Sequence, residues 1–575
     1  MKNPEIRFAK PPLRWLWGGF GFQNSESLMT GLMTDEFRDE RALKSFLEIS
    51  PSYSRVFAGF ADWTKEAMDR FADWYDASFR KCGTTLYAVP GRMPMIMEDF
   101  DCDAYAESTA RNLEYVVKER GCSRIAYFAV TNECSVGPVY NWFGKPDPDG
   151  RDRWKIFRDL NRAMFRAFRR HGLDIGLMNT DQSGVPRLKD IEAAMTTLDE
   201  VTDTWCWHYY DKDATAGDPG NYGRWIALFR DVVAMLEGKV PQRIALGEFG
   251  LKGRATARAE SGCDGVMRDD RSYTARHPAE AAVSAISRAE MGIAAMNAGF
   301  MTAVSWTFCD YPDPSIGWPG GETTRERADH DLRKHGGAGR DLRYNKWGLF
   351  RWDDEGHDYS SYSDLYTMGW LAKLFRRGGR VLPWATEDET LRVGAVTNAN
   401  GSLSIALVNW GDAKEATLRI PHPVAKPMRL YEYDSANIPF SPFNDLQGVK
   451  CLVEADTGAD GESVVRVPLA AKSMVFLTTD YEDRVPAPVR DVCLDGGVLR
   501  WTASEAPEHR YYRVFHEGHQ IASTVADHLE VDGTGTVCFQ RAENDTPDAC
   551  RTSAPDFRVV SVDRWNNEGR RNEAL

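Results

Sequence analysis

The 575-residue sequence lacks several features that define whole classes of protein. No apolar stretch approaches the roughly 18 residues of a membrane-spanning helix, and the N-terminal residues contain no apolar run typical of a signal peptide. Lysine and arginine total 71 against 85 aspartate and glutamate, a net charge of −14, which argues against binding to nucleic acid or to an anionic membrane. We therefore expect a cytoplasmic protein that binds neither.

Cysteine is present, but not in a pattern that indicates cross-links or metal. The 11 cysteines are an odd number and include no CxxC pair, so neither a disulfide framework nor a structural zinc site is indicated. Cys538 and Cys550 are a conceivable bridge, which the lack of an export signal disfavours. Asp147-Pro-Asp149-Gly150 lacks the further ligands of a calcium loop. We expect no metal and no cofactor.

The first two thirds of the chain alternate short apolar runs with stretches of helical spacing. Near-continuous apolar strands separated by helices are typical of a parallel (β/α)8 TIM barrel. The alternative is an open doubly wound sheet, which is disfavoured because no strand is followed by a phosphate-binding glycine fingerprint. The eight expected strands are Trp15–Gly21, Tyr53–Ala58, Thr84–Val89, Arg124–Thr131, Asp174–Asn179, Thr202–His208, Gln242–Glu248 and Met301–Thr307.

The remaining third of the chain has no helical run. Residues 379–482 contain short alternating strands separated by Gly, Asn, Asp and Pro, which predicts a β-sandwich packed on a barrel of residues 1–378. Residues 483–575 begin with a proline-containing linker and resemble a fibronectin type III domain, with Trp501 at the core-tryptophan position and Phe557 where the family usually has tyrosine. We expect this module to be tethered and dispensable for chemistry.

Two glutamates occur where a parallel barrel places its reactive groups, at the C-terminal ends of the strands. Glu133 follows the fourth expected strand, and Glu248 ends the seventh. A single glutamate would more often cap a helix or form an ion pair, but a pair in this register can face each other across the barrel mouth. One carboxylic acid to protonate a leaving oxygen and one carboxylate to attack an anomeric carbon are what glycoside hydrolysis needs.

The sequence resembles the retaining glycoside hydrolases of clan A, the (β/α)8 enzymes that include families 5, 30, 39 and 51. The matching residues are Asn132-Glu133, His208-x-Tyr210, Glu248 and Trp306. The resemblance implies that Glu133 is the acid/base and Glu248 the nucleophile. One departure is Cys134, which stands where many relatives have proline.

The resemblance also implies supporting roles. Asn132 would bond the sugar 2-hydroxyl, and Tyr210 would steady the nucleophile. Arg55 would lie beneath Glu248 and keep it ionised, because an adjacent cation lowers the pKa of a carboxylate. Further substrate-binding candidates at the same rim are His208, Trp306, Trp17 and Trp142, although tryptophans at such positions are often core residues.

Long loops at residues 137–152, 251–277 and 310–345 would close one end of a cleft, which favours exo action on short oligosaccharides. We therefore expect a retaining exo-glycosidase. An endo-acting glycanase and a non-catalytic carbohydrate-binding scaffold are the alternatives. The sequence permits a homo-oligomer and does not identify the sugar.

Overall fold

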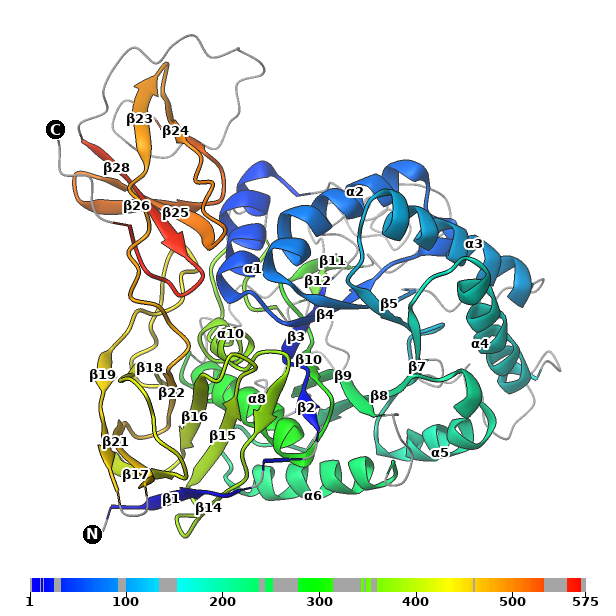
Figure 1. Cartoon of the computed structure of the whole chain (residues 1–575), viewed down its shortest axis with the longest axis horizontal. Coiled ribbons are helices and arrows are strands. Elements are labelled where there is room, and N and C mark those ends of the chain that lie inside the picture. Colours follow the sequence, from blue (N-terminus) through cyan, green and yellow to red (C-terminus); the bar gives the residue numbers. More distant parts are fainter. Residues whose placement is uncertain are drawn as a thin grey trace.

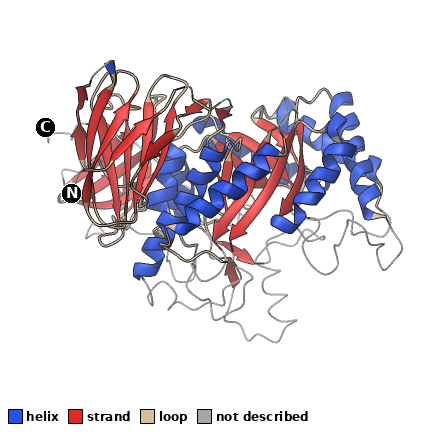
Figure 2. Cartoon of the chain, turned by 90° about the horizontal axis from the view of Figure 1, so that it is seen from below, coloured by secondary structure: helices blue, strands red, loops and turns tan. Residues whose placement is uncertain are grey.

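The computed structural model describes residues 3–10, 12–13, 15–24, 33–90, 100–133, 152–211, 213–236, 243–251, 278–313, 343–345, 348–352, 359–458, 461–531 and 556–569. Three parts are visible in Figure 1: a large barrel, a β-sandwich beside it and a small β module at the C-terminal end. Seen from a second direction, the sandwich lies against one side of the barrel (Figure 2).

Eight parallel strands form a closed barrel in the order β10-β3-β4-β5-β6-β7-β8-β9, which confirms the predicted fold class. The strands are β3 (Phe20–Asn24), β4 (Tyr53–Phe57), β5 (Thr85–Val89), β6 (Ile125–Phe128), β7 (Gly176–Ser183), β8 (Thr204–Asp211), β9 (Ile244–Leu251) and β10 (Ala303–Ser305). Most expected strands match to within a few residues. The fifth, however, continues four residues beyond Asn179, and this extension places a residue in the site described below.

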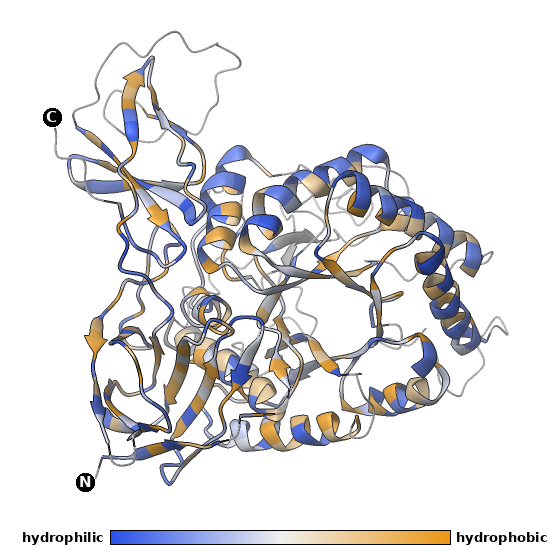
Figure 3. Cartoon of the chain, viewed as in Figure 1, coloured by the Kyte–Doolittle hydropathy of each residue, from blue (hydrophilic) through white to orange (hydrophobic). Residues whose placement is uncertain are grey.

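Helices surround the barrel because each has one apolar face. In α4, for example, Phe157, Leu160, Met164 and Phe168 recur at helical spacing and are buried, while Figure 3 shows hydrophilic residues on much of its remaining surface. Side-chain oxygens of Thr64, Asp101 and Asp152 cap the N-termini of α2, α3 and α4. The helices are α1 (Leu43–Ile49), α2 (Lys65–Tyr75), α3 (Cys102–Glu114), α4 (Arg153–Arg170), α5 (Leu188–Thr197), α6 (Gly220–Ala234), α8 (Pro278–Ala298) and α10 (Leu365–Leu374).

Short helical segments extend or connect these helices. Among the described residues, the π-helical segments are η2 (Phe37–Ala42), which precedes α1, η4 (Asp76–Arg80), which follows α2, and η6 (Tyr115–Glu119), which follows α3. The short 3₁₀ segments in the same part of the chain are η3 (Phe60–Asp62), η7 (Val185–Arg187) and η8 (Asp199–Val201). A two-stranded antiparallel sheet of β11 (Tyr311–Asp313) and β12 (Arg343–Asn345) follows the last barrel strand.

The sandwich consists of a five-stranded sheet, β14-β1-β17-β21-β20, and a seven-stranded sheet, β19-β18-β22-β16-β15-β13-β2. Its core contains apolar residues of both sheets, such as Leu418 and Val465 opposite Ile405 and Val475. The strands are β1 (Glu5–Phe8), β2 (Leu16–Trp17), β13 (Gly379–Val381), β14 (Trp384–Thr386), β15 (Leu391–Thr397), β16 (Leu403–Asn409), β17 (Lys414–Ile420), β18 (Met428–Asp434), β19 (Cys451–Val453), β20 (Ala455–Thr457), β21 (Ser463–Leu469) and β22 (Ser473–Thr478).

The N-terminal residues differ from the expectation that they belong to the barrel. Residues 5–8 pair with β17 in parallel and with β14 in antiparallel orientation, and residues 16–17 pair with β13. The expected first strand, Trp15–Gly21, is thus two strands of different sheets, because the chain leaves the sandwich after Trp17 and enters the barrel at Phe20.

The C-terminal module contains two three-stranded antiparallel sheets, β23-β24-β27 and β26-β25-β28. Trp501 is buried between them, with its ring centroid 5.3 Å from that of Tyr512. The strands are β23 (Arg490–Asp495), β24 (Val498–Thr502), β25 (His509–His516), β26 (His519–Thr524), β27 (His528–Glu530) and β28 (Phe557–Asp563).

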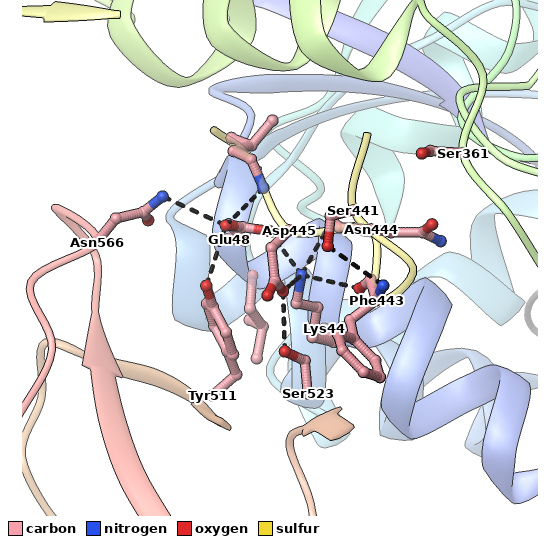
Figure 4. Close-up of polar contacts among 12 residues, drawn as sticks. Lys44, Glu48, Ser361, Ser441, Phe443, Asn444, Asp445, Tyr511, Ser523 and Asn566 are labelled. Carbon is pink, nitrogen blue, oxygen red and sulfur yellow. Dashed lines mark hydrogen bonds and ion pairs between the residues drawn. The ribbon is translucent and has the colours of Figure 1, made fainter. Parts of the chain in front are cut away.

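This module is docked on the barrel rather than merely tethered, as Figure 4 shows. Lys44 and Glu48 of α1 form a buried ion pair with an Nζ–Oε2 distance of 2.8 Å, and Asp445 of the sandwich lies 2.5 Å from the same ammonium. From the module, the Tyr511 hydroxyl and the Asn566 amide donate to Glu48 Oε1 at 3.0 and 3.2 Å. The module, which was expected to be tethered through residues 483–489, therefore also makes direct contacts with the barrel.

Two further expectations concern cysteines and membranes. Cys493 of β23 is disulfide-bonded, although the cysteine pattern of the sequence indicated no disulfide framework. Cys538 and Cys550 lie outside the described residues. Among the described helices, none is long and apolar enough to cross a bilayer.

Candidate active site

The two predicted glutamates meet at the C-terminal ends of the barrel strands. Glu248 lies on β9 and is buried, whereas the Glu133 side chain, just after β6, is 21% exposed. One carboxylate oxygen of each lies within 4.8 Å of the other. His208 of β8 contacts both, with its Nδ1 at 2.8 Å from Glu133 Oε1 and at 3.4 Å from Glu248 Oε2.

Glu248 is held by donors on both oxygens. Arg55 Nη1 donates to Oε1 and the Tyr210 hydroxyl donates to Oε2, each at 2.7 Å. Burial raises the pKa of Glu248 above its usual range, although His208 and Arg55 act in the opposite direction. Arg55 thus lies against Glu248 as expected, but its charge does not outweigh burial. The fixed donors orient the carboxylate, which a nucleophile attacking one carbon atom requires.

Arg55 is the central cation of the site and is fully buried. Besides Glu248 it donates to Gln23 of β3 at 2.5 Å, to the Asn132 side-chain oxygen at 2.8 Å and to Asp181 of β7 at 2.7 Å. A guanidinium presents its donors in a fixed planar fork, so these acceptors from four strand ends are held in one arrangement. The contact with Asn132 also fixes which way that amide faces.

Two irregularities in strand pairing direct the charges inward. Pairing of β8 with β9 shifts between Trp207 and His208, so Gly247 is an extra residue and Glu248 comes opposite His208. A side chain at Gly247 is excluded, because a Cβ there would lie 2.2 Å from Cys206 Sγ. Pairing of β7 with β8 shifts in the same way at Asp181. Bulges of this kind redirect side chains and are frequent next to active sites.

Asp181 is a central residue of this cluster that was not predicted from the sequence. It contacts Arg55 through Oδ2 and His208 Nε2 through Oδ1, the latter at 2.9 Å, and Tyr87 of β5 and Cys206 of β8 donate to it as well. A signal was available, since Thr180-Asp181-Gln182 directly follows an apolar run, just as Glu133 follows its own. The expected strand stopped at Asn179 and so left Asp181 unexamined.

His208 is buried with a carboxylate beside each ring nitrogen, an arrangement that favours its protonated form. Burial alone would lower the pKa of its imidazole, but Glu248 and Asp181 outweigh burial and raise that pKa well above its usual range. Burial would likewise raise the pKa of Asp181, yet Arg55 and His208 hold it well below its usual range. The site therefore places two basic side chains, Arg55 and His208, among three carboxyl groups.

Three tryptophans, Trp17, Trp142 and Trp306, were predicted to bind substrate at the barrel rim. Trp306 follows β10, its backbone N–H donates to Phe249 O at 3.2 Å, and its ring meets Phe57 edge-on at 5.7 Å, so it lies at the expected rim. Trp17 does not: it is buried in β2, and its indole donates to the Phe375 carbonyl, so it packs at the junction with the sandwich. Trp142 lies outside the described residues.

Within the part of the chain that the structure describes, two groups of side chains have the atom types of a metal site: Asp181, Cys206 and His208, and Glu133, His208 and Glu248. Arg55 lies 2.7 Å from a carboxylate of each group. A guanidinium at that distance repels a bound cation and already satisfies the carboxylates electrostatically. The donor set therefore fits proton and nucleophile chemistry better than metal binding.

Comparison with protein-family models and with curated proteins finds no match for the chain. Solved structures do resemble it. The bacterial orthologue of human α-L-iduronidase is 13% identical with a TM-score of 0.55, covering 99% of each chain. The catalytic domain of a glycoside hydrolase family 30 xylanase from Talaromyces cellulolyticus is 13% identical with a TM-score of 0.52, over 82% of this chain and 99% of that one.

A family 51 arabinofuranosidase from Xanthomonas axonopodis pv. citri is also 13% identical, with a TM-score of 0.52 over 83% of this chain and 99% of that one. At such low identity the likeness concerns architecture, and functions must be argued from the site itself. The chain has the fold of these glycoside hydrolases, a (β/α)8 barrel followed by β-sheet domains.

Proposed function

We propose that the protein is a retaining glycoside hydrolase in which Glu133 is the acid/base and Glu248 the nucleophile. The observation that carries this proposal is the approach of the two carboxylates, which have one oxygen each within 4.8 Å of the other. Retaining enzymes have their carboxyl groups about 5–5.5 Å apart, whereas inverting enzymes need about 6.5–9.5 Å to admit a water molecule.

The geometry supports a double displacement. Glu248 attacks the anomeric carbon while Glu133 donates its proton to the departing glycosidic oxygen, so that one C–O bond forms as the other breaks. Glu133, now ionised, takes a proton from water, and the resulting hydroxide oxygen displaces Glu248 from the sugar. Glu133 is again protonated and Glu248 again ionised, and the two inversions at the anomeric carbon give retention of configuration.

The surrounding residues have distinct tasks in this proposal. Arg55 and Tyr210 fix the nucleophile through the two 2.7 Å hydrogen bonds. His208 lies between the two glutamates, where a positive charge stabilises either one while it is ionised. Asn132 would bond the sugar 2-hydroxyl and Trp306 would pack on the sugar ring.

We propose exo action on a short oligosaccharide or glycoside, with an endo-acting glycanase as the alternative. The shared architecture over nearly the whole chain with the bacterial iduronidase orthologue makes uronides worth including among the test substrates. The buried Trp501 between two sheets supports a fibronectin type III-like assignment of residues 483–575, with residues 379–482 as the sandwich.

Mechanism-based labelling tests the proposal. A panel of aryl glycosides, including glucosides, xylosides, arabinosides and uronides, identifies the sugar by released phenol. The matching 2-deoxy-2-fluoro glycoside should then form a covalent adduct at Glu248, located by peptide mass spectrometry. Glu248→Ala should abolish labelling and turnover, while Glu290→Gln, a change at a buried glutamate of α8 outside the site, should retain both.

Adduct formation elsewhere, or full activity of Glu248→Ala, would remove the mechanism. Turnover with inverted product would replace it by single displacement. Sugar binding without turnover of any glycoside would instead favour the carbohydrate-binding scaffold.

A further inference from the structure

We infer that Asp181 is the positioning residue of this site: it holds Arg55 and His208 as charged donors aimed at Glu248 and Glu133. The inference rests on the proposed function for its kinetic consequences. Asp181 is fully buried, so it does not touch a substrate and acts only through other residues.

The first support is the number of groups that converge on this one side chain. Arg55 of β4 and Tyr87 of β5 reach it from one side, and Cys206 and His208 of β8 reach it from the other. Four donors satisfy both carboxylate oxygens, which is the condition for a buried charge to be stable in a barrel interior. A residue that merely filled space would need none of these donors.

The second support is the backbone. Asp181 is the extra residue of the β7 bulge and has a φ of 59°, in the left-handed backbone region that residues other than glycine seldom adopt. Its carbonyl accepts the backbone N–H of Glu133 at 2.9 Å, and Glu133 has a φ of 44°. Non-glycine residues in this region cluster at functional sites. One residue thus fixes the acid/base through its backbone and both cations through its side chain.

The third support is charge balance. Arg55 and His208 face Glu248 from one direction, and Asp181 faces the same two cations from the other. Without Asp181, His208 would lose two of the interactions that raise its pKa, the charge of Asp181 and the hydrogen bond to it, so burial would favour the neutral imidazole more strongly. Tyr53, Tyr87 and Cys206, which also lie near Asp181, are neutral at ordinary pH, since burial raises the pKa of each.

The test measures the protonation of His208 and turnover separately. Histidine-selective ¹⁵N labelling of the full chain gives the titration of each imidazole, and His208→Gln identifies the signal of His208. We expect His208 to be protonated at pH 7 in the wild type. In Asp181→Asn its midpoint should move to lower pH by about one unit or more, the effect of removing an adjacent opposite charge.

On the substrate found by the glycoside panel, Asp181→Asn should lower kcat on the order of 10²-fold, as misplacement of catalytic groups does, with KM nearly unchanged. The matched control is Asp190→Asn in α5, because Asp190 is equally buried and lies near Arg187 but outside the site. This control should change neither the His208 titration nor kcat.

Wild-type His208 that is neutral at pH 7, or an unchanged titration in Asp181→Asn, would overturn the inference whether or not the protein hydrolyses glycosides. Wild-type kcat in an Asp181→Asn variant of an active enzyme would also overturn it. If the titration moves but the wild type hydrolyses no glycoside, the positioning of His208 stands and the proposed function fails. If Asp181→Asn does not fold, two other measurements test the inference. One is the titration of His208 in the wild type. The other is the His208 titration and kcat of Tyr87→Phe, which removes one donor to Asp181.

Discussion

The buried Lys44 ammonium joins all three parts of the protein, so its removal should destabilise them together. Lys44 Nζ contacts Glu48 Oε2 at 2.8 Å and Asp445 Oδ1 at 2.5 Å, and it donates to the Phe443 and Asn444 carbonyls at 3.3 and 3.0 Å. Lys44→Met preserves most of the side-chain volume but leaves two buried carboxylates without their shared cation. Removing one partner of a buried ion pair costs about 3–5 kcal/mol.

The chain offers a matched control for this experiment. Lys65 and Asp69 of α2 form the same i,i+4 lysine–carboxylate pair at 2.9 Å, but the Lys65 side chain is 66% exposed. Water and salt screen such a pair, so Lys65→Met should leave the urea midpoint of unfolding unchanged. An intermediate case is Tyr511→Phe, which removes one hydrogen bond to the Glu48 carboxylate and should cost about 1.5–3 kcal/mol.

Unfolding is followed by fluorescence in urea and by limited proteolysis between residues 483 and 489. Lys44→Met should lower the midpoint most, Tyr511→Phe less and Lys65→Met least. In a double-mutant cycle, Lys44→Met with Glu48→Gln should cost less than the sum of the single changes, because the second change neutralises one stranded carboxylate. Equal midpoints for Lys44→Met and Lys65→Met would refute the view that this buried network holds the parts together.

Glu133→Ala should lower turnover of natural glycosides on the order of 10²–10⁴-fold but hardly slow glycosylation of the enzyme by a dinitrophenyl glycoside. Azide should restore turnover and give a glycosyl azide of retained configuration. Equal loss on both substrates without rescue would exclude Glu133 as the acid/base. Tyr210→Phe removes a hydrogen-bond donor that favours ionised Glu248, so the pKa of Glu248, which burial already raises, should rise further. The acidic limb of the kcat/KM–pH profile should therefore move to higher pH. An unmoved limb would count against Glu248 as the origin of that limb. Truncation after residue 482 should lower the thermal inactivation temperature of the barrel, because Glu48 and Asp445 lose hydrogen-bond partners. Residual activity after heating measures this temperature. An unchanged temperature would show that the module is dispensable for the stability of the barrel.

The barrel and the positions of Glu133 and Glu248 could be predicted from the sequence, because regular patterns and a general rule of barrel geometry indicate both. Alternating apolar strands and helices predicted the barrel, and the rule that reactive groups follow parallel strands brought Glu133, His208 and Glu248 to one place. The prediction failed at Asp181, which lies beyond the end of the expected fifth strand. Asp181 enters the site through a bulge, and no period of two or 3.6 residues marks an extra residue.

Contacts between distant parts of the chain were equally invisible to local patterns. Trp17 was expected on the first barrel strand because apolar residues around it continue into Phe20. Its strand pairs instead with Gly379, more than three hundred residues away, and such pairing partners leave no local signature. The same holds for Glu48, whose partners in the C-terminal module make a buried carboxylate on a barrel helix stable.

The position of α1 connects the docked module to the active site. Helix α1 ends at Ile49 and β4 begins at Tyr53, so the strand that carries Arg55 starts just after the helix that carries Lys44 and Glu48. Arg55 in turn holds Glu248, Asn132 and Asp181. A chain whose module has separated loses the partners that keep α1 in place, and any shift of α1 reaches Arg55 through a few residues. Loss of activity and release of the module should therefore occur at the same urea concentration in Lys44→Met, whereas a module that was only an appendage would separate first and leave activity intact.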